Sequence, residues 1–208
     1  MIAAAPCVFV VDDDDSVRKA LGRLLGSAGL RAETFGSAEE FLCHDRPDAP
    51  GCLLLDVELP GLDGLELQRR LDEANVGLPI IFITGHGDIP MSVQAMKAGA
   101  ADFLAKPFDD ETLLHAIRQA VTRDELVRQR DADVSIVRRR AESLSPRERE
   151  VLVLVVSGFM NKQIGRRLGV TEKTIKVHRG QVMRKMNTRS LADLVRMAGM
   201  IGIQPVAG

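Results

Sequence analysis

The chain has 208 residues, a length that favours two modest domains over one small one. The formal net charge is −1, but it is unevenly distributed: residues 1–121 carry 10 basic and 20 acidic side chains, whereas residues 122–208 carry 18 and 9. Chance clustering of charge is the simpler alternative. A basic domain joined to an acidic one instead predicts a nucleic-acid partner for the second half and a cation or a regulatory role for the first.

The sequence argues against a membrane protein and against a secreted one. Its longest apolar stretch, Val151–Val156, is far shorter than the roughly 18–20 residues that span a bilayer. The N-terminus lacks the basic region of a signal peptide. Three cysteines, Cys7, Cys43 and Cys52, form no Cys-x-x-Cys pair and lie beside apolar residues, which predicts buried, reduced thiols. We therefore expect a soluble, cytoplasmic protein with no membrane partner.

The first half alternates short apolar runs with segments of helical period. The expected strands are Cys7–Val11, Arg31–Phe35, Cys52–Leu55, Ile80–Thr84 and Phe103–Ala105. The expected helices are Ser16–Ala28, Ala38–Cys43, Gly64–Asn75 and Met91–Ala98, and a last helix begins at Asp110. Runs such as CVFVV suit strands that are buried on both sides. The pattern predicts an α/β domain, a doubly wound five-stranded parallel sheet with helices on both faces.

The boundary between the two domains is expected in a helical, increasingly charged stretch. We interpret residues 1–124 as the first domain, 125–142 as a helical linker and 143–208 as the second domain. A solvated surface and a dimeric coiled coil both fit the weak apolar periodicity of the linker.

The second domain is predicted to be all-α, with four short helices. Ser145-Pro146-Arg147-Glu148 forms a capping box with Pro at the first helical position, and Gly158 ends that helix. Asn161, Thr171 and Ser190 are expected to cap the three helices that follow. The second and third of these four helices, joined by a short turn that contains glycine, form a helix-turn-helix.

Polar side chains follow four of the five predicted strands. Asp12 and Asp13 follow the first strand, Asp56 follows the third, Thr84 ends the fourth, and Lys106 follows the fifth. Because open parallel sheets bind ligands at the carboxyl ends of their strands, we expect these groups around one crevice. Strand-end acids are common, and a threonine alone is a weak signal. The prediction depends on the combination.

This combination predicts a metal site and a nucleophile. Three neighbouring carboxylates repel one another unless a cation is present, and Mg²⁺ or another divalent cation in its place takes oxygen ligands. A carboxylate beside such an ion can attack a phosphoryl donor, and Asp56 is the candidate because it ends the most uniformly apolar central strand. Thr84 and Lys106 would bind the phosphoryl oxygens. A cis peptide bond before Pro107 would direct Lys106 inward.

The third helix of the second domain has one apolar and one basic stripe. The side chains expected to face the core are Ile175, Val182, Met183 and Met186. The opposite stripe comprises Lys173, Lys176, Val177, Gly180 and Arg184. In the major groove, lysine can donate to guanine or to phosphate, and valine can touch a thymine methyl. Thr174 and Arg179 flank this stripe and are expected to bind phosphate. A solvated basic helix is the alternative, but residues 143–208 carry 12 basic and only 4 acidic side chains.

The segments VVDDD, LLLDVELPGLDG and FITGHGDIPMSVQAMKAGAADFLAKPF closely resemble the flavodoxin-like receiver domain of two-component response regulators. The resemblance implies phosphoryl transfer from a sensor histidine kinase to Asp56. It also implies that Asp13, Asp56 and the backbone carbonyl of Glu58 bind Mg²⁺, with Asp12 acting near the metal through water.

The same resemblance implies a switch. Thr84 would follow the phosphoryl group inward, and Phe103 would rotate with it, although plain core packing of Phe103 is the alternative. Glu58 and His86 occupy positions that in the family tune how fast the phosphoryl group is lost.

The segment LSPREREVLVLVVSGFMNKQIGRRLGVTEKTIKVHRGQVMRKM is similar to the LuxR-type helix-turn-helix, so the whole chain resembles FixJ-like regulators. The resemblance implies that Lys176 and Val177 face bases and that the last helix, Leu191–Ala198, forms a dimer interface. Gly180 departs from the family pattern, because a family member can carry at this position a larger side chain that contacts a base or a phosphate. Glycine inside a helix also costs about 1 kcal/mol relative to alanine.

Together these features predict a transcription factor that is switched by phosphorylation of Asp56. Its expected partners are a sensor histidine kinase, double-stranded promoter DNA, RNA polymerase and, on activation, a second copy of itself. We expect no enzymatic activity beyond Mg²⁺-dependent self-phosphorylation and slow self-dephosphorylation. A phosphohydrolase would carry a second aspartate two residues after the nucleophile, where Glu58 stands. A constitutive DNA-binding protein with a docking receiver is the third alternative.

Overall fold

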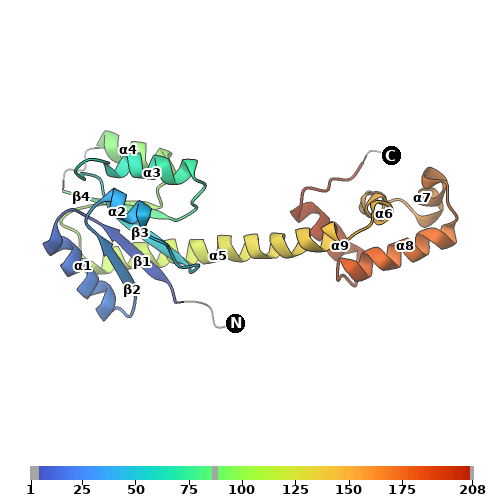
Figure 1. Ribbon diagram of the computed structural model, residues 1–208, viewed down its shortest axis with the longest axis horizontal. Coiled ribbons are helices and arrows are strands. Elements are labelled where there is room, and N and C mark those ends of the chain that lie inside the picture. The colour runs from blue at the N-terminus through green and yellow to red at the C-terminus, as the bar shows by residue number, and fades with distance from the viewer. Residues whose placement is uncertain (1–4, 86–88, 207–208) are drawn as a thin grey trace. The chain divides into compact units, whose positions relative to one another are not determined.

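The computed structural model describes residues 5–85 and 89–206, and the chain divides into two compact units, Met1–Arg128 and Gln129–Gly208 (Figure 1). The first unit contains one sheet of five parallel strands: β1 (Cys7–Val11), β2 (Arg31–Phe35), β3 (Gly51–Asp56), β4 (Ile80–Thr84) and β5 (Asp102–Ala105). Their order in the sheet is β2-β1-β3-β4-β5. The predicted doubly wound parallel sheet is confirmed, with strand bounds that differ from prediction by at most one residue.

Helices cover both faces of this sheet. On one face lie α2 (Ala38–Cys43), α3 (Gly64–Glu73) and α4 (Ile89–Lys97), which bury Phe41, Leu67 and Ala95 among others. On the other face lie α1 (Asp15–Ser27) and the first turns of α5 (Asp110–Glu142), which bury Leu25 and Ile117. Strands β1, β3 and β4 are buried along their whole length, as expected for strands between two helical layers.

Helix α5 is continuous over 33 residues and takes part in both units. Between Val121 and Val137, Asp124 is the only buried residue, so most of the predicted linker 125–142 is solvated surface. The last turns belong to the core of the second unit, where Val137, Ala141 and Leu144 are buried. The second unit therefore includes part of the stretch that was interpreted as a linker.

The remaining helices of the second unit are α6 (Pro146–Val156), α7 (Asn161–Leu168), α8 (Glu172–Lys185) and α9 (Leu191–Met200). The capping box at Ser145 and the N-caps Thr171 and Ser190 are confirmed. The predicted cap Asn161 is wrong by one position. The N-cap is Met160, whose backbone N–H is bound by the side chain of Gln163 at 2.8 Å.

One of the three cysteines differs from the prediction. Cys7 and Cys52 are buried, and burial raises the pKa of their thiols to about 11 and about 12. Cys43 is exposed, because α2 buries Phe41 and Cys43, two residues later, lies on the opposite side of the helix. In the described part of the chain, no helix is long and apolar enough to cross a membrane.

Candidate functional site: an acidic pocket and a basic helix

The carboxyl ends of the strands bring the predicted polar residues to one edge of the sheet. Val11 lies beside Leu55, and Ile83 lies beside Asp56, so the residues that end these strands are neighbours. Asp12 and Thr84 are fully buried, and Asp56 is nearly so. The structure therefore places Asp12, Asp56 and Thr84 around one point, as the strand topology predicts.

Lys106 joins the two buried carboxylates of this edge. Its Nζ donates to Oδ2 of Asp12 at 2.8 Å and to Oδ2 of Asp56 at 2.7 Å. Partial burial opposes the charge of the ammonium group, but hydrogen bonds and attraction from the two aspartates outweigh it and raise the pKa of Lys106. The Lys106–Pro107 peptide bond is cis, as predicted. Lys106 is therefore charged and held beside Asp56.

Three carboxylates form a cluster that suits a hard cation. Asp12, Asp13 and Asp56 each offer an oxygen, and these oxygens lie within 4.8 Å of one another. Burial raises the pKa of Asp12, although Lys106 and the backbone N–H of Asp14 act in the opposite direction. One ammonium group faces three carboxylates, which leaves excess negative charge. An all-oxygen donor set with excess negative charge fits Mg²⁺ or a similar divalent ion.

The structure places the predicted switch residues close to this pocket. The carbonyl oxygen of Thr84 accepts from the backbone N–H of Lys106 at 2.7 Å, so strand ends β4 and β5 are held together. Phe103 is half-buried and packs on Phe82 with a centroid separation of 6.4 Å. The Glu58 side chain is exposed, and its backbone N–H donates to Oδ1 of Asp56 at 3.0 Å. His86 lies outside the described residues.

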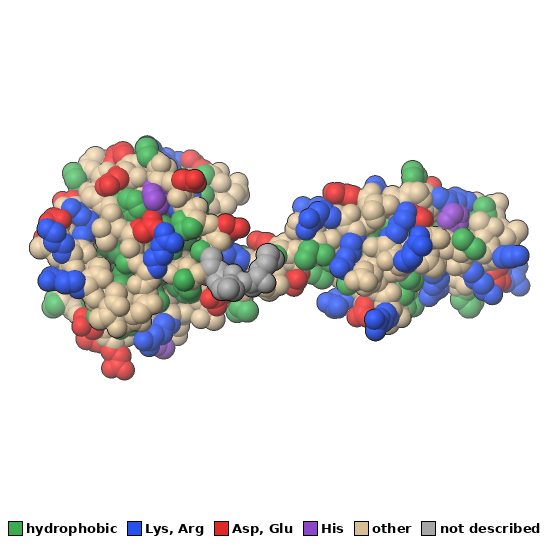
Figure 2. All heavy atoms as spheres, turned by 60° about the horizontal axis from the view of Figure 1, so that its bottom comes forward, with side chains coloured by type: hydrophobic (Ala, Val, Ile, Leu, Met, Phe, Trp, Pro, Cys, Tyr) green, Lys and Arg blue, Asp and Glu red, His purple; other side chains and the backbone are tan. Residues whose placement is uncertain are grey.

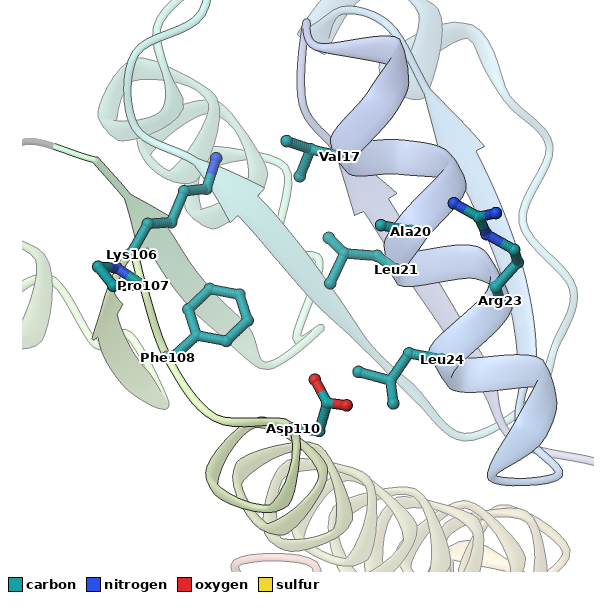
Figure 3. Close-up of a pocket in the computed structure, with 9 residues that line it drawn as sticks. All are labelled: Val17, Ala20, Leu21, Arg23, Leu24, Lys106, Pro107, Phe108 and Asp110. Atoms are coloured by element: carbon teal, nitrogen blue, oxygen red, sulfur yellow. The ribbon is translucent and has the colours of Figure 1, made fainter.

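A cavity of about 450 Å³ adjoins the acidic pocket, with Lys106 as the shared residue. Figure 3 shows the side chains of Lys106 and Phe108 on one side and those of Val17, Leu21 and Leu24 from α1 on the other. Lys106, which binds the Asp56 carboxylate, thus also lines a largely apolar depression on the surface of the first unit.

In the second unit, α8 presents its predicted basic stripe to solvent. Ile175, Val182 and Met186 are fully buried, and Met183 packs against the same core. The residues of the opposite stripe are all exposed: Lys173, Lys176, Val177, Gly180 and Arg184. Figure 2 shows Lys and Arg side chains over much of the visible face of this unit. The stripe also carries one exposed apolar side chain, Val177 at 58% exposure, which suits contact with a partner better than contact with water.

The two predicted phosphate contacts have partners within the unit. The Thr174 hydroxyl lies 2.9 Å from that of Thr171, and Arg179 donates to Oδ1 of Asn161 at 3.3 Å. Both residues are half-buried. Arg179 thereby links α8 to the first residue of α7, which helps to hold the two helices in place relative to each other.

Sequence comparison now assigns both units. Residues 8–118 match the family described as response regulator receiver domain, and residues 142–198 match the bacterial regulatory proteins of the luxR family. The chain belongs to the response regulator family. Its receiver contains the acidic pocket, and its LuxR-type domain contains the basic helix α8. This response regulator is therefore a DNA-binding transcription regulator of a two-component system.

Relatives of this response regulator match it along nearly its whole length. It is 53% identical to nodulation protein W of Bradyrhizobium diazoefficiens, covering 94% of this chain and 86% of the relative. It is 42% identical to the transcriptional regulatory protein FixJ of Rhizobium meliloti, covering 95% and 97%. Among solved structures, the response regulator StyR is 51% identical with a TM-score of 0.86, covering 94% of this chain and 99% of that one.

Sequence reasoning did not identify two residues of this response regulator that bind the acidic loop or the basic helix. Arg18 donates to the backbone oxygen of Asp12 at 2.7 Å. Glu148 was identified as part of a capping box, yet it also accepts from Nζ of Lys185 on α8 at 2.6 Å. Asp14 is the N-cap of α1, and Arg18 lies about one helical turn after it, which was the available signal. No sequence pattern indicates which backbone atom a guanidinium reaches.

Proposed function

We propose that Asp56 accepts a phosphoryl group from a sensor histidine kinase and that the phosphorylated chain binds promoter DNA as a homodimer to regulate transcription. The observation that carries this proposal is the position of the Asp56 carboxylate. It lies at the carboxyl end of a central strand, 2.7 Å from the Lys106 ammonium and within the cluster of three acidic side chains.

In the proposed transfer, an oxygen of Asp56 attacks the phosphorus, the bond from phosphorus to the donor nitrogen breaks, and an acyl phosphate forms. Lys106 then pairs with the phosphoryl oxygens and compensates their charge. Asp13, Asp56 and the backbone carbonyl of Glu58 would hold Mg²⁺, or another divalent cation, and Asp12 would act through water. When bound, such an ion would supply further positive charge at this pocket. Self-phosphorylation and slow self-dephosphorylation are the only chemistry proposed.

Thr84 and Phe103 are proposed to report the phosphoryl group to the rest of the receiver. The buried Thr84 lies at the end of β4, and Phe103 lies on the neighbouring strand β5 against Phe82. In this proposal, a hydroxyl drawn towards the phosphoryl oxygens would vacate space into which the half-buried Phe103 would turn. Glu58 and His86 are proposed to set the lifetime of the acyl phosphate.

On the DNA side, we assign Lys176 and Val177 to base edges and Lys173 and Arg184 to the groove or phosphates. All four are exposed on α8. Thr174 and Arg179 remain proposed phosphate contacts, although each also has a partner inside the unit.

The proposed dimer uses α9, on which Leu191 and Val195 are exposed at 41% and 40%. RNA polymerase is the proposed partner at the promoter, in the cytoplasm where the DNA is found.

Two measurements test the two halves of this proposal. Intact mass spectrometry after incubation with Mg²⁺ and a small phosphoryl donor should show one added phosphoryl group on the wild type and none on Asp56→Asn. Phosphoryl gain by Asp56→Asn would refute the assignment of the acceptor.

Lys176→Ala should weaken binding to a promoter fragment, because a good base contact is worth about 1–3 kcal/mol, and it should leave phosphorylation unchanged. Unchanged binding to the promoter fragment would contradict the assignment of Lys176 to DNA, whereas equal loss of both activities would indicate misfolding.

A further inference from the structure

Arg18, on the first turn of α1, reaches back to the loop that carries the acidic cluster. Its Nη1 donates to the backbone carbonyl oxygen of Asp12 at 2.7 Å, and its Nη2 lies 3.2 Å from Oδ1 of Asp15. The Arg18 side chain is only 19% exposed, so it is held along the surface of the loop. A planar guanidinium that donates in two directions holds its partners in a defined geometry.

The carbonyl oxygen that Arg18 binds belongs to the peptide unit between Asp12 and Asp13. Because a peptide unit is planar, fixing its oxygen fixes the direction in which the chain continues to Asp13. The other polar atoms of Asp12 are also bound: its N–H donates to Phe35 and its two carboxylate oxygens accept from Asp14 and Lys106. Asp13 itself is exposed. The Arg18 contact therefore constrains the part of the loop that places the Asp13 carboxylate.

The loop after β2 also lies close to the guanidinium of Arg18. A Cβ atom added to Gly36 would lie 3.7 Å from Cζ and from Nη1 of Arg18, and 3.6 Å from Oε2 of Glu40. Gly36 therefore lies close to the guanidinium, and its N–H donates to Oε2 of Glu40 at 2.7 Å. The guanidinium of Arg18 therefore lies between the loops that follow β1 and β2.

We propose that Arg18 is a positioning residue for the divalent cation: it holds the Asp12–Asp13 peptide so that the Asp13 carboxylate faces Asp12 and Asp56. This inference rests on the proposed metal site and names a residue that acts on it through the backbone. Groups that orient metal ligands typically contribute a factor of about 10–100 to metal affinity. Because Arg18 binds a backbone oxygen, we expect the lower end, about tenfold.

A positioning role and a purely electrostatic role of Arg18 predict opposite effects of its substitution on Mg²⁺ affinity, so the two roles can be distinguished. A guanidinium near the cluster repels a divalent cation, so if Arg18 acted only through its charge, Arg18→Ala would bind Mg²⁺ more tightly and Arg18→Lys would bind it normally. If Arg18 positions the loop, both variants lose affinity, because neither alanine nor lysine reproduces the two-directional fork. Lys19 supplies the matched control, since it also pairs with Asp15 but forms no hydrogen bond or ion pair with Asp12 among the described residues.

The experiment is calorimetric titration of the full-length wild type and of Arg18→Lys, Arg18→Ala and Lys19→Ala with MgCl₂, with thermal unfolding midpoints measured in parallel. The expected result is a dissociation constant about tenfold higher for both Arg18 variants and within about twofold of wild type for Lys19→Ala.

Wild-type affinity in Arg18→Lys, or tighter binding by Arg18→Ala, would overturn the proposal. A lower unfolding midpoint with unchanged Mg²⁺ affinity would assign Arg18 to stability alone and overturn it too. Failure of the wild type to bind Mg²⁺ would count instead against the proposed metal site.

Discussion

Removing the positive charge of Lys106 should have a large and diagnostic effect on the stability of the receiver. Lys106→Met keeps most of the side-chain volume and removes two charge-assisted hydrogen bonds, to Asp12 and Asp56. Such bonds contribute roughly 1.5–3 kcal/mol each. Because the Lys106 side chain is 24% exposed, water compensates part of the loss, and we expect destabilisation of about 2–3 kcal/mol at pH 7.

The pH dependence of this loss follows from the carboxyl that remains. Burial already raises the pKa of Asp12, and Lys106 opposes that rise. A carboxyl group whose pKa is raised on folding adds to the free energy of unfolding. This added stability is fully present below the ordinary pKa of about 3.9 and is lost as the pH rises through the raised pKa. Without Lys106 the pKa rises further, so the folded variant takes up a proton more readily than the unfolded chain. The destabilisation should therefore shrink as the pH falls from about 7 to about 5.

The assay is urea denaturation of both proteins at several pH values, followed by far-UV circular dichroism because the chain contains no Trp or Tyr. The two compact units require a fit with two transitions, of which only the receiver transition should move. Added Mg²⁺ should restore part of the lost stability, since it supplies the missing positive charge. A loss of stability that changes neither with pH nor with added Mg²⁺ would refute the electrostatic reasoning.

Two further pairs of substitutions test packing in each unit. Gly180→Ala should raise the stability of the helical unit by up to about 1 kcal/mol, because a Cβ there meets no atom within 4 Å. Gly64→Ala should lower receiver stability by about 2 kcal/mol, because its Cβ would lie 2.3 Å from the carbonyl oxygen of Asp56; thermal unfolding measures both. Val137→Ser should destabilise the LuxR-type unit by about 2 kcal/mol, whereas Ile136→Ser, at 39% exposure, should cost under about 0.5 kcal/mol. Equal effects of the last two would show that the end of α5 is not part of that core.

Much of the receiver could be predicted from sequence because its physical rules are local. Strands buried on both faces appear as continuous apolar runs, and parallel strands bring their carboxyl ends to one edge. Asp12, Asp56, Thr84 and Lys106 follow such runs, so their convergence needed no knowledge of distant packing.

Features that depend on the third dimension were harder to predict. Cys43 has apolar neighbours in sequence but lies on the outer side of a short helix. Asn161 has the right chemistry for a cap, yet Met160 occupies that position while the Asn161 amide binds Arg179. Val137 lies in a charged stretch and is buried only because α6 to α9 form a core around it. Contacts between segments distant in sequence decided the cases of Asn161 and Val137, and the side of α2 that packs on the sheet decided the case of Cys43.

We propose that phosphorylation of Asp56 controls DNA binding by α8. The most direct test is a fluorescence anisotropy titration of a labelled promoter fragment with wild type and Asp56→Asn, each with and without a small phosphoryl donor, in the presence of Mg²⁺. We predict that the donor tightens binding of the wild type and leaves Asp56→Asn unchanged. Equal affinities of the wild type with and without donor, under conditions where mass spectrometry shows the phosphoryl group in place, would contradict phosphorylation control of DNA binding.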